Sequence, residues 1–346
     1  MKKGISIVIC CYNSSRLIGD CLLYICRSRV PDNLKWEVIV VDNNSNDDTS
    51  AKAEKILSGY GSTVSYNILS QPEPGLSSAR RTGFENAEYE YVIFCDDDNR
   101  LNENYLELAF NIMEGNKKIG AMGGDSIAIT DGSFPEWFKE YQRNYSVGKQ
   151  SEKPGDITWE NSGLWGAGMV LRREALADLF SQGYKSLLSD RKGNQLSSGG
   201  DIEMCYALRL AGWKIWYEPG LKLDHYIIKE KLNWSYLRRL SRGFGAQKVD
   251  FDAYLKAFEP KPKTFNQNLE QRWIYQSIRQ LKKIRRYGIR KLMEFNRSGE
   301  GDSEILRIEK AIGRLRELLK IRGLYSDRIN SVKNASWRKI FSTENT

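Results

Sequence analysis

The sequence has no long apolar run, no cysteine framework and only one histidine among its 346 residues. No stretch approaches the ~18 apolar residues that a membrane-spanning helix needs, so no helical span is expected. The six cysteines include no CxxC pair and no regular spacing, and we therefore expect reduced, buried thiols in a cytoplasmic protein. No small-residue cleavage site follows the apolar run after Lys3, which argues against export.

Positive and negative charges are divided unevenly along the chain. Residues 1–228 contain 25 Lys and Arg against 31 Asp and Glu, whereas residues 229–346 contain 28 against 13. The length by itself suggests roughly two domains. The division of charge predicts a near-neutral body followed by a basic region that has an anionic partner.

Strand and helix patterns alternate through the first half of the chain. Short apolar runs predict strands at residues 5–11, 36–41, 64–69 and 91–95. The segments between them have helical spacing, and Ser14 or Ser15 is the predicted cap of the first helix. Units of this length favour an α/β fold with parallel strands and right-handed crossovers.

Two common nucleotide-binding motifs are absent. The turn after the first predicted strand reads Cys-Cys-Tyr-Asn-Ser-Ser at residues 10–15 and contains no glycine. A Rossmann dinucleotide site needs GxGxxG at this point, and no P-loop sequence occurs elsewhere in the chain. Both of these solutions to nucleotide binding are therefore excluded.

Three acids, Asp96, Asp97 and Asp98, follow the strand predicted at residues 91–95. Ligands of open α/β sheets bind beyond the carboxyl ends of the strands. Adjacent carboxylates repel one another unless a cation lies between them, and Mg²⁺ typically combines one or two carboxylates with substrate phosphates. A metal site and an acidic start of a helix near Glu103 both fit this pattern.

Several motifs in order resemble family 2 glycosyltransferases of the GT-A fold. They are Cys-Tyr-Asn at residues 11–13, Val-Val-Asp-Asn-Asn-Ser at 40–45, Gly-Leu-Ser-Ser-Ala-Arg at 75–80 and the acid cluster at 96–98. Further similar segments are Trp-Gly-Ala-Gly-Met at 165–169, Gly-Asp-Ile-Glu at 200–203 and residues 217–225. The resemblance covers about residues 4–245, and the remaining residues match nothing that we can name.

The resemblance implies an α/β GT-A fold with a mostly parallel central sheet, flanking helices and a helical C-terminal region. Residues 1–228 would form the glycosyltransferase domain, with the nucleotide-sugar side in about 1–125 and the acceptor side in about 126–228. Residues 229–346 would form the basic helical region. The implied activity is inverting transfer of a sugar from a nucleoside diphosphate donor of the UDP or dTDP type to a hydroxyl of a glycan or lipid-linked acceptor.

The resemblance also implies roles for individual residues, with Mn²⁺ or Mg²⁺ as the cofactor. Asp98 matches the direct metal ligand, and His225 matches a position that often holds a further one, with Asp224 placed to orient its ring. Asp201 matches the catalytic base, and Glu203 is the fallback base. The other expected site residues are Cys10, Tyr12, Asn13, Asp42, Arg80, Asp96 and Asp97 on the nucleotide-sugar side, and Trp165, Gly166, Ala167 and Glu203 on the acceptor side.

Some positions depart from the family or allow a second interpretation. Cys10 stands where the family usually has proline, and Gly200 stands where it usually has an acid. Asp42 matches the acceptor for a pyrimidine base but also suits a turn. Arg80 suits a diphosphate, and the alternative is an exposed helix residue.

The expected product is a single glycosidic bond per encounter. Processive membrane synthases of the family carry Gln-x-x-Arg-Trp, whereas residues 269–273 here read Leu-Glu-Gln-Arg-Trp. We expect a role in cell-envelope or exopolysaccharide biosynthesis, in the cytoplasm or on the cytoplasmic face of the membrane. The alternative of a different class is a catalytically silent GT-A module that binds nucleotide sugar or glycan as a scaffold.

Two further patterns leave alternatives open. The aromatic residues between positions 130 and 160 suit both stacking on sugar rings and packing in a core. Residues 273–292 carry apolar residues at helical spacing among Lys and Arg. This is typical of a helix on an anionic membrane surface and also of a helix packed on its own domain. Nucleic-acid binding is not expected, because no recognised motif accompanies the charge; the oligomeric state is not predicted.

Overall fold

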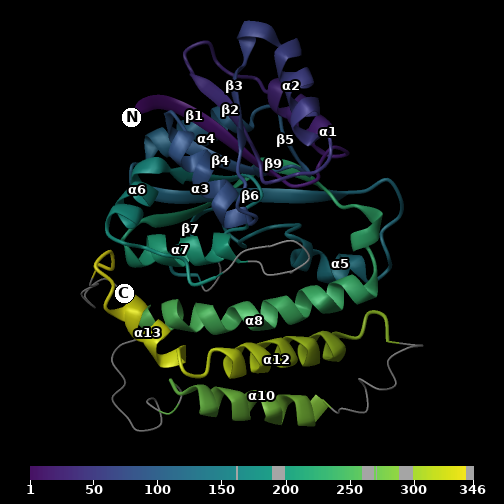
Figure 1. The fold of residues 1–346 in the computed structure, drawn as a ribbon, viewed down its shortest axis with the longest axis vertical. Coiled ribbons are helices and arrows are strands. Elements are labelled where there is room, and N and C mark those ends of the chain that lie inside the picture. The colour runs from purple at the N-terminus through teal and green to yellow at the C-terminus, as the bar shows by residue number, and fades with distance from the viewer. Residues whose placement is uncertain (161–162, 189–198, 259–268, 270, 288–298, 340–346) are drawn as a thin grey trace.

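The computed structural model describes residues 1–160, 163–188, 199–258, 269, 271–287 and 299–339 (Figure 1). Within these residues one sheet of nine strands has the order β3-β2-β1-β4-β8-β6-β9-β5, and β7 pairs with β9. The strands are β1 (Lys2–Cys11), β2 (Trp36–Asp42), β3 (Ser65–Ser70), β4 (Tyr89–Asp96), β5 (Asn99–Leu101), β6 (Ile119–Ile129), β7 (Gly155–Asp156), β8 (Met169–Arg172) and β9 (Lys214–Tyr226).

The first four strands confirm the predicted alternation. β3, β2, β1 and β4 pair in parallel, with Ile7 of β1 opposite Val38 on one side and Ile93 on the other. The rest of the sheet is mixed, because β8 runs antiparallel to both β4 and β6 while β6 and β9 are parallel. The half of the sheet that the sequence pattern predicted is therefore entirely parallel, and the other half is mixed.

Helices cover both faces of this sheet. α1 (Ile18–Cys26), α2 (Thr49–Gly59) and α4 (Tyr105–Gly115) pack on one face, and α3 (Leu76–Asn86), α6 (Arg173–Ser181) and α7 (Gly200–Leu210) pack on the other. Successive β1 residues enter opposite cores, because side chains alternate along a strand. The cap prediction for α1 is wrong, because α1 has no side-chain cap and the Ser14 hydroxyl donates to Asp97 instead.

The strand that carries the acid cluster is buried on both faces, as predicted. Residues 91–95 of β4 are each at most 2% exposed. After Asp96 the chain turns into β5, and α4 begins only at Tyr105, following Asn104, whose side chain makes no capping bond. A helix does begin near Glu103, but residues 97–99 do not cap it, because β5 begins at Asn99 and separates them from α4.

Helices after residue 228 form successive layers below the sheet (Figure 1). They are α8 (Trp234–Phe258), α10 (Trp273–Tyr287), α12 (Ser303–Lys320) and α13 (Tyr325–Lys333). Phe251 and Tyr254 of α8 pack in the same core as α7, so the helical region and the sheet share a core. The part of the predicted basic helix at residues 288–292 lies outside the described residues.

α8 and α12 meet backbone to backbone. A Cβ added at Gly245 or at Gly313 would lie 1.9 Å from a carbonyl oxygen of the facing helix. Beside this crossing, the fully buried Glu309 of α12 pairs with Arg238 at 2.7 Å and with Arg242 at 2.6 Å, both from α8. The two glycines permit the approach, and the ion pairs neutralise the buried carboxylate.

The aromatic segment mainly packs a core. It includes α5 (Phe138–Tyr141) and the 3₁₀ turn η2 (Gln142–Tyr145); the other 3₁₀ turns are η1 (Gly61–Thr63) and η3 (Lys229–Lys231). Trp137, Phe138 and Tyr145 are at most 8% exposed and cluster with Trp234 of α8. Trp159, by contrast, is 61% exposed. The core interpretation therefore holds for most of the segment.

Two expectations from composition can be compared with the described residues. None of the helices described is both long and apolar enough to cross a bilayer. All six cysteines are free thiols, and four of them are buried. Burial raises the pKa of the Cys205 thiol to about 12, so this side chain remains protonated at neutral pH.

Candidate active site

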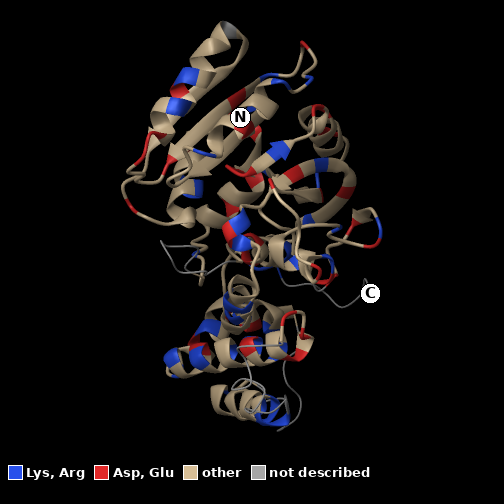
Figure 2. Ribbon diagram, turned by 90° about the vertical axis from the view of Figure 1, so that its right-hand side faces the viewer, with Lys and Arg blue, Asp and Glu red and all other residues tan. Residues whose placement is uncertain are grey.

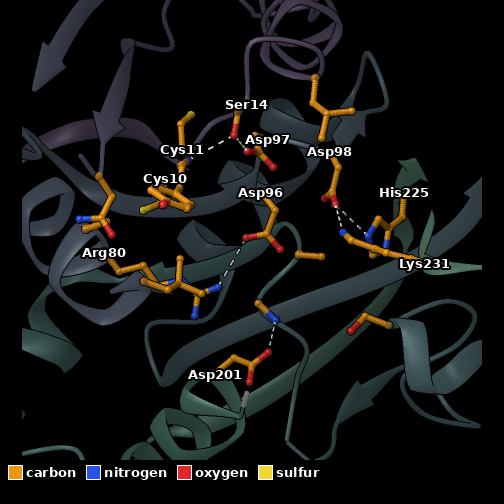
Figure 3. Close-up of a pocket in the computed structure, with 18 of the residues that line it drawn as sticks. Cys10, Cys11, Ser14, Arg80, Asp96, Asp97, Asp98, Asp201, His225 and Lys231 are labelled. Atoms are coloured by element: carbon orange, nitrogen blue, oxygen red, sulfur yellow. Dashed lines mark hydrogen bonds and ion pairs between the residues drawn. The ribbon is translucent and has the colours of Figure 1, made fainter. Parts of the chain in front are cut away.

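A cleft of about 440 Å³ lies at the carboxyl ends of β1, β2 and β4 (Figure 3). Because these parallel strands end at the same edge of the sheet, their following loops meet there. The cleft is completed by His225 of β9 and by Tyr236 and Leu240 of α8. Of the residues predicted from sequence, its lining contains Cys10, Tyr12, Asn13, Arg80, Asp96, Asp97, Asp98, Gly166, Ala167, Asp201 and His225.

The loop after β1 is held by the loop after β2. Asn13 adopts a left-handed backbone conformation, with φ of 52°. Its backbone N–H donates to Ser45 Oγ at 2.9 Å, and its side-chain oxygen accepts from the Asn46 N–H at 2.9 Å. The Ser14 hydroxyl donates to Asp97, which ties this loop to the acid cluster. These bonds fix the loop against the turn after β2 and against the acid cluster.

Arg80 and Asp96 form a charged pair in the wall of the cleft. Nη2 of Arg80 lies 3.7 Å from Oδ1 of Asp96, and the guanidinium lies 5.4 Å from the centre of the Phe94 ring. Arg80 is only 7% exposed, so it is not the exposed helix residue of the alternative interpretation. Its packing on Phe94 and its ion pair orient the guanidinium toward the acids (Figure 3).

The acid cluster is crowded with negative charge. Burial and the neighbouring Asp98 raise the pKa of Asp97 to about 7, although the hydrogen bond from Ser14 lowers it. A bound cation would offset the repulsion between these carboxylates and stabilise their ionised form.

Asp98 faces two nitrogen groups. Its Oδ2 lies 3.5 Å from His225 Nε2 and 3.4 Å from Lys231 Nζ (Figure 3). His225 is brought there by the pairing of β5 with β9, in which Asn99 is opposite His225. Lys231 was not predicted, because it lies in η3, far from the acid cluster in sequence, and only the fold brings the two together.

The donor set of Asp98 and His225 fits a divalent cation. Among the described residues, no group of three or more His, Cys, Asp or Glu side chains is arranged to hold a metal. A cation here would therefore complete its coordination with water and bound phosphate oxygens. His225 Nδ1 is buried and has no hydrogen-bond partner within the described ranges, so the expectation that Asp224 orients the ring is wrong.

Asp201 enters the cleft from the first turn of α7. Its Oδ2 accepts a hydrogen bond of 2.6 Å from the Gly166 N–H, and its Oδ1 accepts one of 2.8 Å from the Ile202 N–H. Figure 3 shows it on the opposite side of the pocket from Ser14 and Asp97. The arrangement is a fixed carboxylate that can accept a proton from a bound group.

The segment at residues 165–168 supplies only part of the predicted acceptor side. Gly166 and Ala167 line the cleft, and a Cβ on Gly166 would lie 2.4 Å from Arg80 Nη2. Trp165 is not among the lining residues, because its ring packs 5.5 Å from the Arg143 guanidinium. Gly166 is therefore the point at which this segment contacts both Arg80 and Asp201.

Glu203 does not reach the cleft. Its carboxylate is fully buried and accepts hydrogen bonds from Leu187 N–H at 2.6 Å, Leu188 N–H at 3.2 Å and Tyr254 Oη at 2.5 Å. Each helical residue advances about 100°, so Glu203 points away from Asp201. The structure thus gives Glu203 a role in packing α7 against α8 and does not support its role as fallback base.

The structure also favours the turn interpretation of Asp42. Its Oδ1 accepts a 2.9 Å hydrogen bond from Ser45 N–H, and its other oxygen accepts from the Ser50 hydroxyl. Asn43, which was not predicted, lines the cleft and accepts from Gly75 N–H at 2.7 Å. Its position next to Asp42 in a polar turn was the one sequence signal that could have indicated it.

Comparison with known proteins identifies relatives of this chain. Residues 6–180 match the family described as glycosyl transferase family 2. A cholesterol galactosyltransferase of Borreliella burgdorferi is 33% identical over 111 residues, which are 32% of this chain and 29% of that protein. A poly-beta-1,6-N-acetyl-D-glucosamine synthase of Staphylococcus aureus is 23% identical over 79% of this chain and 63% of its own length. The chain thus spans less than two thirds of both relatives.

Solved structures confirm the expected fold. Residues 1–349 of S. aureus TarS in complex with UDP match with a TM-score of 0.51 and 16% identity, over 94% of this chain and 92% of that one. The mannosyltransferase PcManGT of Pyrobaculum calidifontis, in complex with GDP-Man and Mn²⁺, matches with a TM-score of 0.53 and 14% identity, over 96% and 74%. The predicted GT-A architecture is confirmed.

Proposed function

Because this chain belongs to glycosyl transferase family 2, we propose that its cleft transfers a sugar from a nucleoside diphosphate donor to a hydroxyl acceptor. The observation that carries the proposal is that one cleft contains Asp98 beside His225 and, across from them, Asp201 fixed by Gly166. Asp98 and His225 suit a cation that is bound to a diphosphate, and Asp201 suits removal of a proton. The proposed transfer uses both.

Asp98, His225 and Arg80 are the residues that would bind the diphosphate of the donor. Asp98 and His225 would hold Mn²⁺ or Mg²⁺, which when bound stabilises negative charge on the departing diphosphate. Arg80 presents a guanidinium fork that matches the oxygens of a diphosphate. Tyr12 and Asn13, in the loop fixed by Ser45 and Asn46, remain for the nucleoside, which we propose to be of the UDP or dTDP type.

The acceptor half rests on Asp201. The acceptor oxygen forms a bond to the anomeric carbon while the bond from that carbon to the diphosphate breaks, and the hydroxyl proton passes to Asp201. Attack on the face opposite the diphosphate inverts the anomeric configuration. The Gly166 and Ile202 N–H groups hold the carboxylate in one orientation for this transfer.

The relatives support a role in envelope or exopolysaccharide biosynthesis, which we propose takes place on the cytoplasmic side. One is named for synthesis of a poly-N-acetylglucosamine and another for galactosyl transfer to cholesterol. A glycan or lipid-linked hydroxyl acceptor is consistent with both names. The leucine at position 269, in place of the glutamine of the processive motif, supports the transfer of one sugar per encounter.

A binding screen tests this function. We expect UDP or dTDP to raise the melting temperature with Mn²⁺ or Mg²⁺ present and much less with EDTA, because a ligand at 100 times its Kd adds about 2.7 kcal/mol of stability. Guanosine and adenosine diphosphates serve as controls for the base. Metal-independent binding, or no binding of any nucleoside diphosphate, would contradict the donor half. Binding without turnover on any glycan or lipid acceptor would instead support the silent scaffold.

Replacing Gly166 by alanine is expected to reduce turnover about 10²-fold. The new methyl group would press on Arg80 and displace the N–H that holds Asp201, and a misplacement of about 1 Å at a catalytic group can cost that much. The measurement is kcat for nucleoside diphosphate release. Gly115→Ala is the matched control, because a Cβ there meets nothing within 4 Å. Equal rates for both variants would remove Gly166 from the mechanism.

A further inference from the structure

The outermost helical layer, α10, turns an apolar face to solvent. Ile274, Ile278 and Leu281 are 53%, 46% and 54% exposed, and their i, i+4, i+7 spacing places them on one side of the helix. The opposite side is polar and buried, with Gln276 and Gln280 only 4% and 3% exposed. The helix is therefore packed through its polar side and displays its apolar side.

α10 packs against α12 (Figure 1). Arg314 of α12 donates a 3.3 Å hydrogen bond to the Gln276 side chain, which fixes the polar side of α10 inward. Trp273, at the start of α10, packs against the core shared with α8. The orientation of the apolar face is thus determined by specific contacts at its back.

Positive charge gathers toward the C-terminal end of the apolar face. α10 contains five basic residues and no acidic one, and Figure 2 shows blue without red on this helix. Lys282 and Arg285 stand one turn beyond Ile278 and Leu281 on the same side, since residues four apart are neighbours on a helix. The other basic residues of the helix are Arg279, Lys283 and Arg286. Burial lowers the pKa of Lys283, and the charges of Arg279, Arg314 and Lys248 lower it further.

We propose that this face of α10 docks on an anionic phospholipid membrane. Ile274, Ile278 and Leu281 enter the boundary between headgroups and acyl chains, and Lys282 and Arg285 reach the lipid phosphates. A lipid surface uses both features of the helix. A nucleic acid would use only the charges, and a second copy of α10 would bring five like charges against five.

Docking through α10 is separate from the transfer reaction, but it would hold the cleft near a membrane surface. α8 lines the cleft through Tyr236 and Leu240, and α12 separates α8 from α10. Packed helix axes lie 8–10 Å apart, so the axis of α8, which lines the cleft, would lie roughly 16–20 Å from the axis of α10. A membrane-anchored acceptor would then meet the cleft from the side of the helical layers.

Vesicle co-sedimentation of the full chain tests the proposal. We expect binding to vesicles of phosphatidylcholine mixed with phosphatidylglycerol, little binding to phosphatidylcholine alone, and weaker binding as salt rises. Ile278→Ser combined with Leu281→Ser should reduce the partition coefficient at least tenfold, since each change removes a large apolar side chain from the interface. Lys282→Gln combined with Arg285→Gln should reduce it about fivefold per charge.

Ile127→Ser is the matched control, because Ile127 of β6 is 55% exposed but lies outside both α10 and the cleft lining. It should bind vesicles as the wild type does. Wild-type binding by the Ile278/Leu281 variant would show that charge alone acts and would overturn the proposal. So would absence of vesicle binding together with a concentration-dependent dimer that the same variant abolishes. Melting temperatures of all variants exclude unfolding, and donor binding is not needed for any of these readouts.

Discussion

Alanine in place of Asp98 is expected to abolish the metal dependence of donor binding. Asp98 and His225 lie 3.5 Å apart and are the two proposed metal ligands. Without Asp98, only the imidazole of His225 remains to hold the cation. Loss of a group one shell further from a metal already costs about 10–100-fold in affinity, so loss of a direct ligand should cost at least 10²-fold. Calorimetric titration of UDP or dTDP with Mn²⁺ and with EDTA measures the effect.

Two comparisons make the Asp98 result specific. Asp178→Ala removes an exposed carboxylate from α6, outside the cleft, and should leave the metal-dependent affinity unchanged. The melting temperature of the Asp98 variant should not fall, because removing Asp98 also relieves repulsion within the acid cluster. If the variant binds donor with the wild-type dependence on Mn²⁺, the cation is held elsewhere.

Asparagine in place of Asp201 should leave donor affinity nearly intact while turnover falls by ~10² to 10⁴-fold, the usual cost of losing a general base. The amide keeps the shape of the side chain and one oxygen acceptor for Gly166 or Ile202, but it cannot take the acceptor proton. Titration gives the donor affinity, and a coupled assay of nucleoside diphosphate release gives kcat. A fall in kcat without a fall in donor affinity distinguishes a general base from a residue that binds the donor.

Glu203→Gln is the control for Asp201, since it removes the charge of a carboxylate two residues along the same helix. Glu203 is held by Leu187, Leu188 and Tyr254 away from the cleft, so this variant should lose stability rather than chemistry. Its turnover below its melting temperature should stay within a few-fold of the wild type. Wild-type turnover in the Asp201 variant together with a collapse in the Glu203 variant would reverse the assignment.

The first half of the sheet and the acid cluster were predictable because their signals are local. The short run of β-branched and aromatic residues at 91–95, bounded by polar residues, favours a buried strand, and the residues that follow it lie at the carboxyl edge of the sheet. Helix geometry, which is also local, could have separated Asp201 from Glu203, because two residues along a helix point in clearly different directions. That criterion was available from the sequence alone.

Other parts of the site depended on contacts that the sequence does not encode locally. Lys231 reaches Asp98 only because β9 pairs with β5 and then turns back. Which residue of the turn after β2 faces the cleft is decided by its backbone conformation, including a φ of 63° at Asn44. Periodicity likewise predicted an amphipathic α10 but not that Gln276 and Gln280 would form its buried side.

The glycine crossing of α8 and α12 limits how relatives can exchange parts. Gly245 and Gly313 meet the facing backbone, and α8 also carries Tyr236 and Leu240 in the cleft wall. A chimera that imported a side chain at either glycine would wedge the helices apart and tilt that wall. The helical layers and the cleft wall are therefore structurally coupled, and we expect a chimera to keep this wall in place only when it carries both glycines.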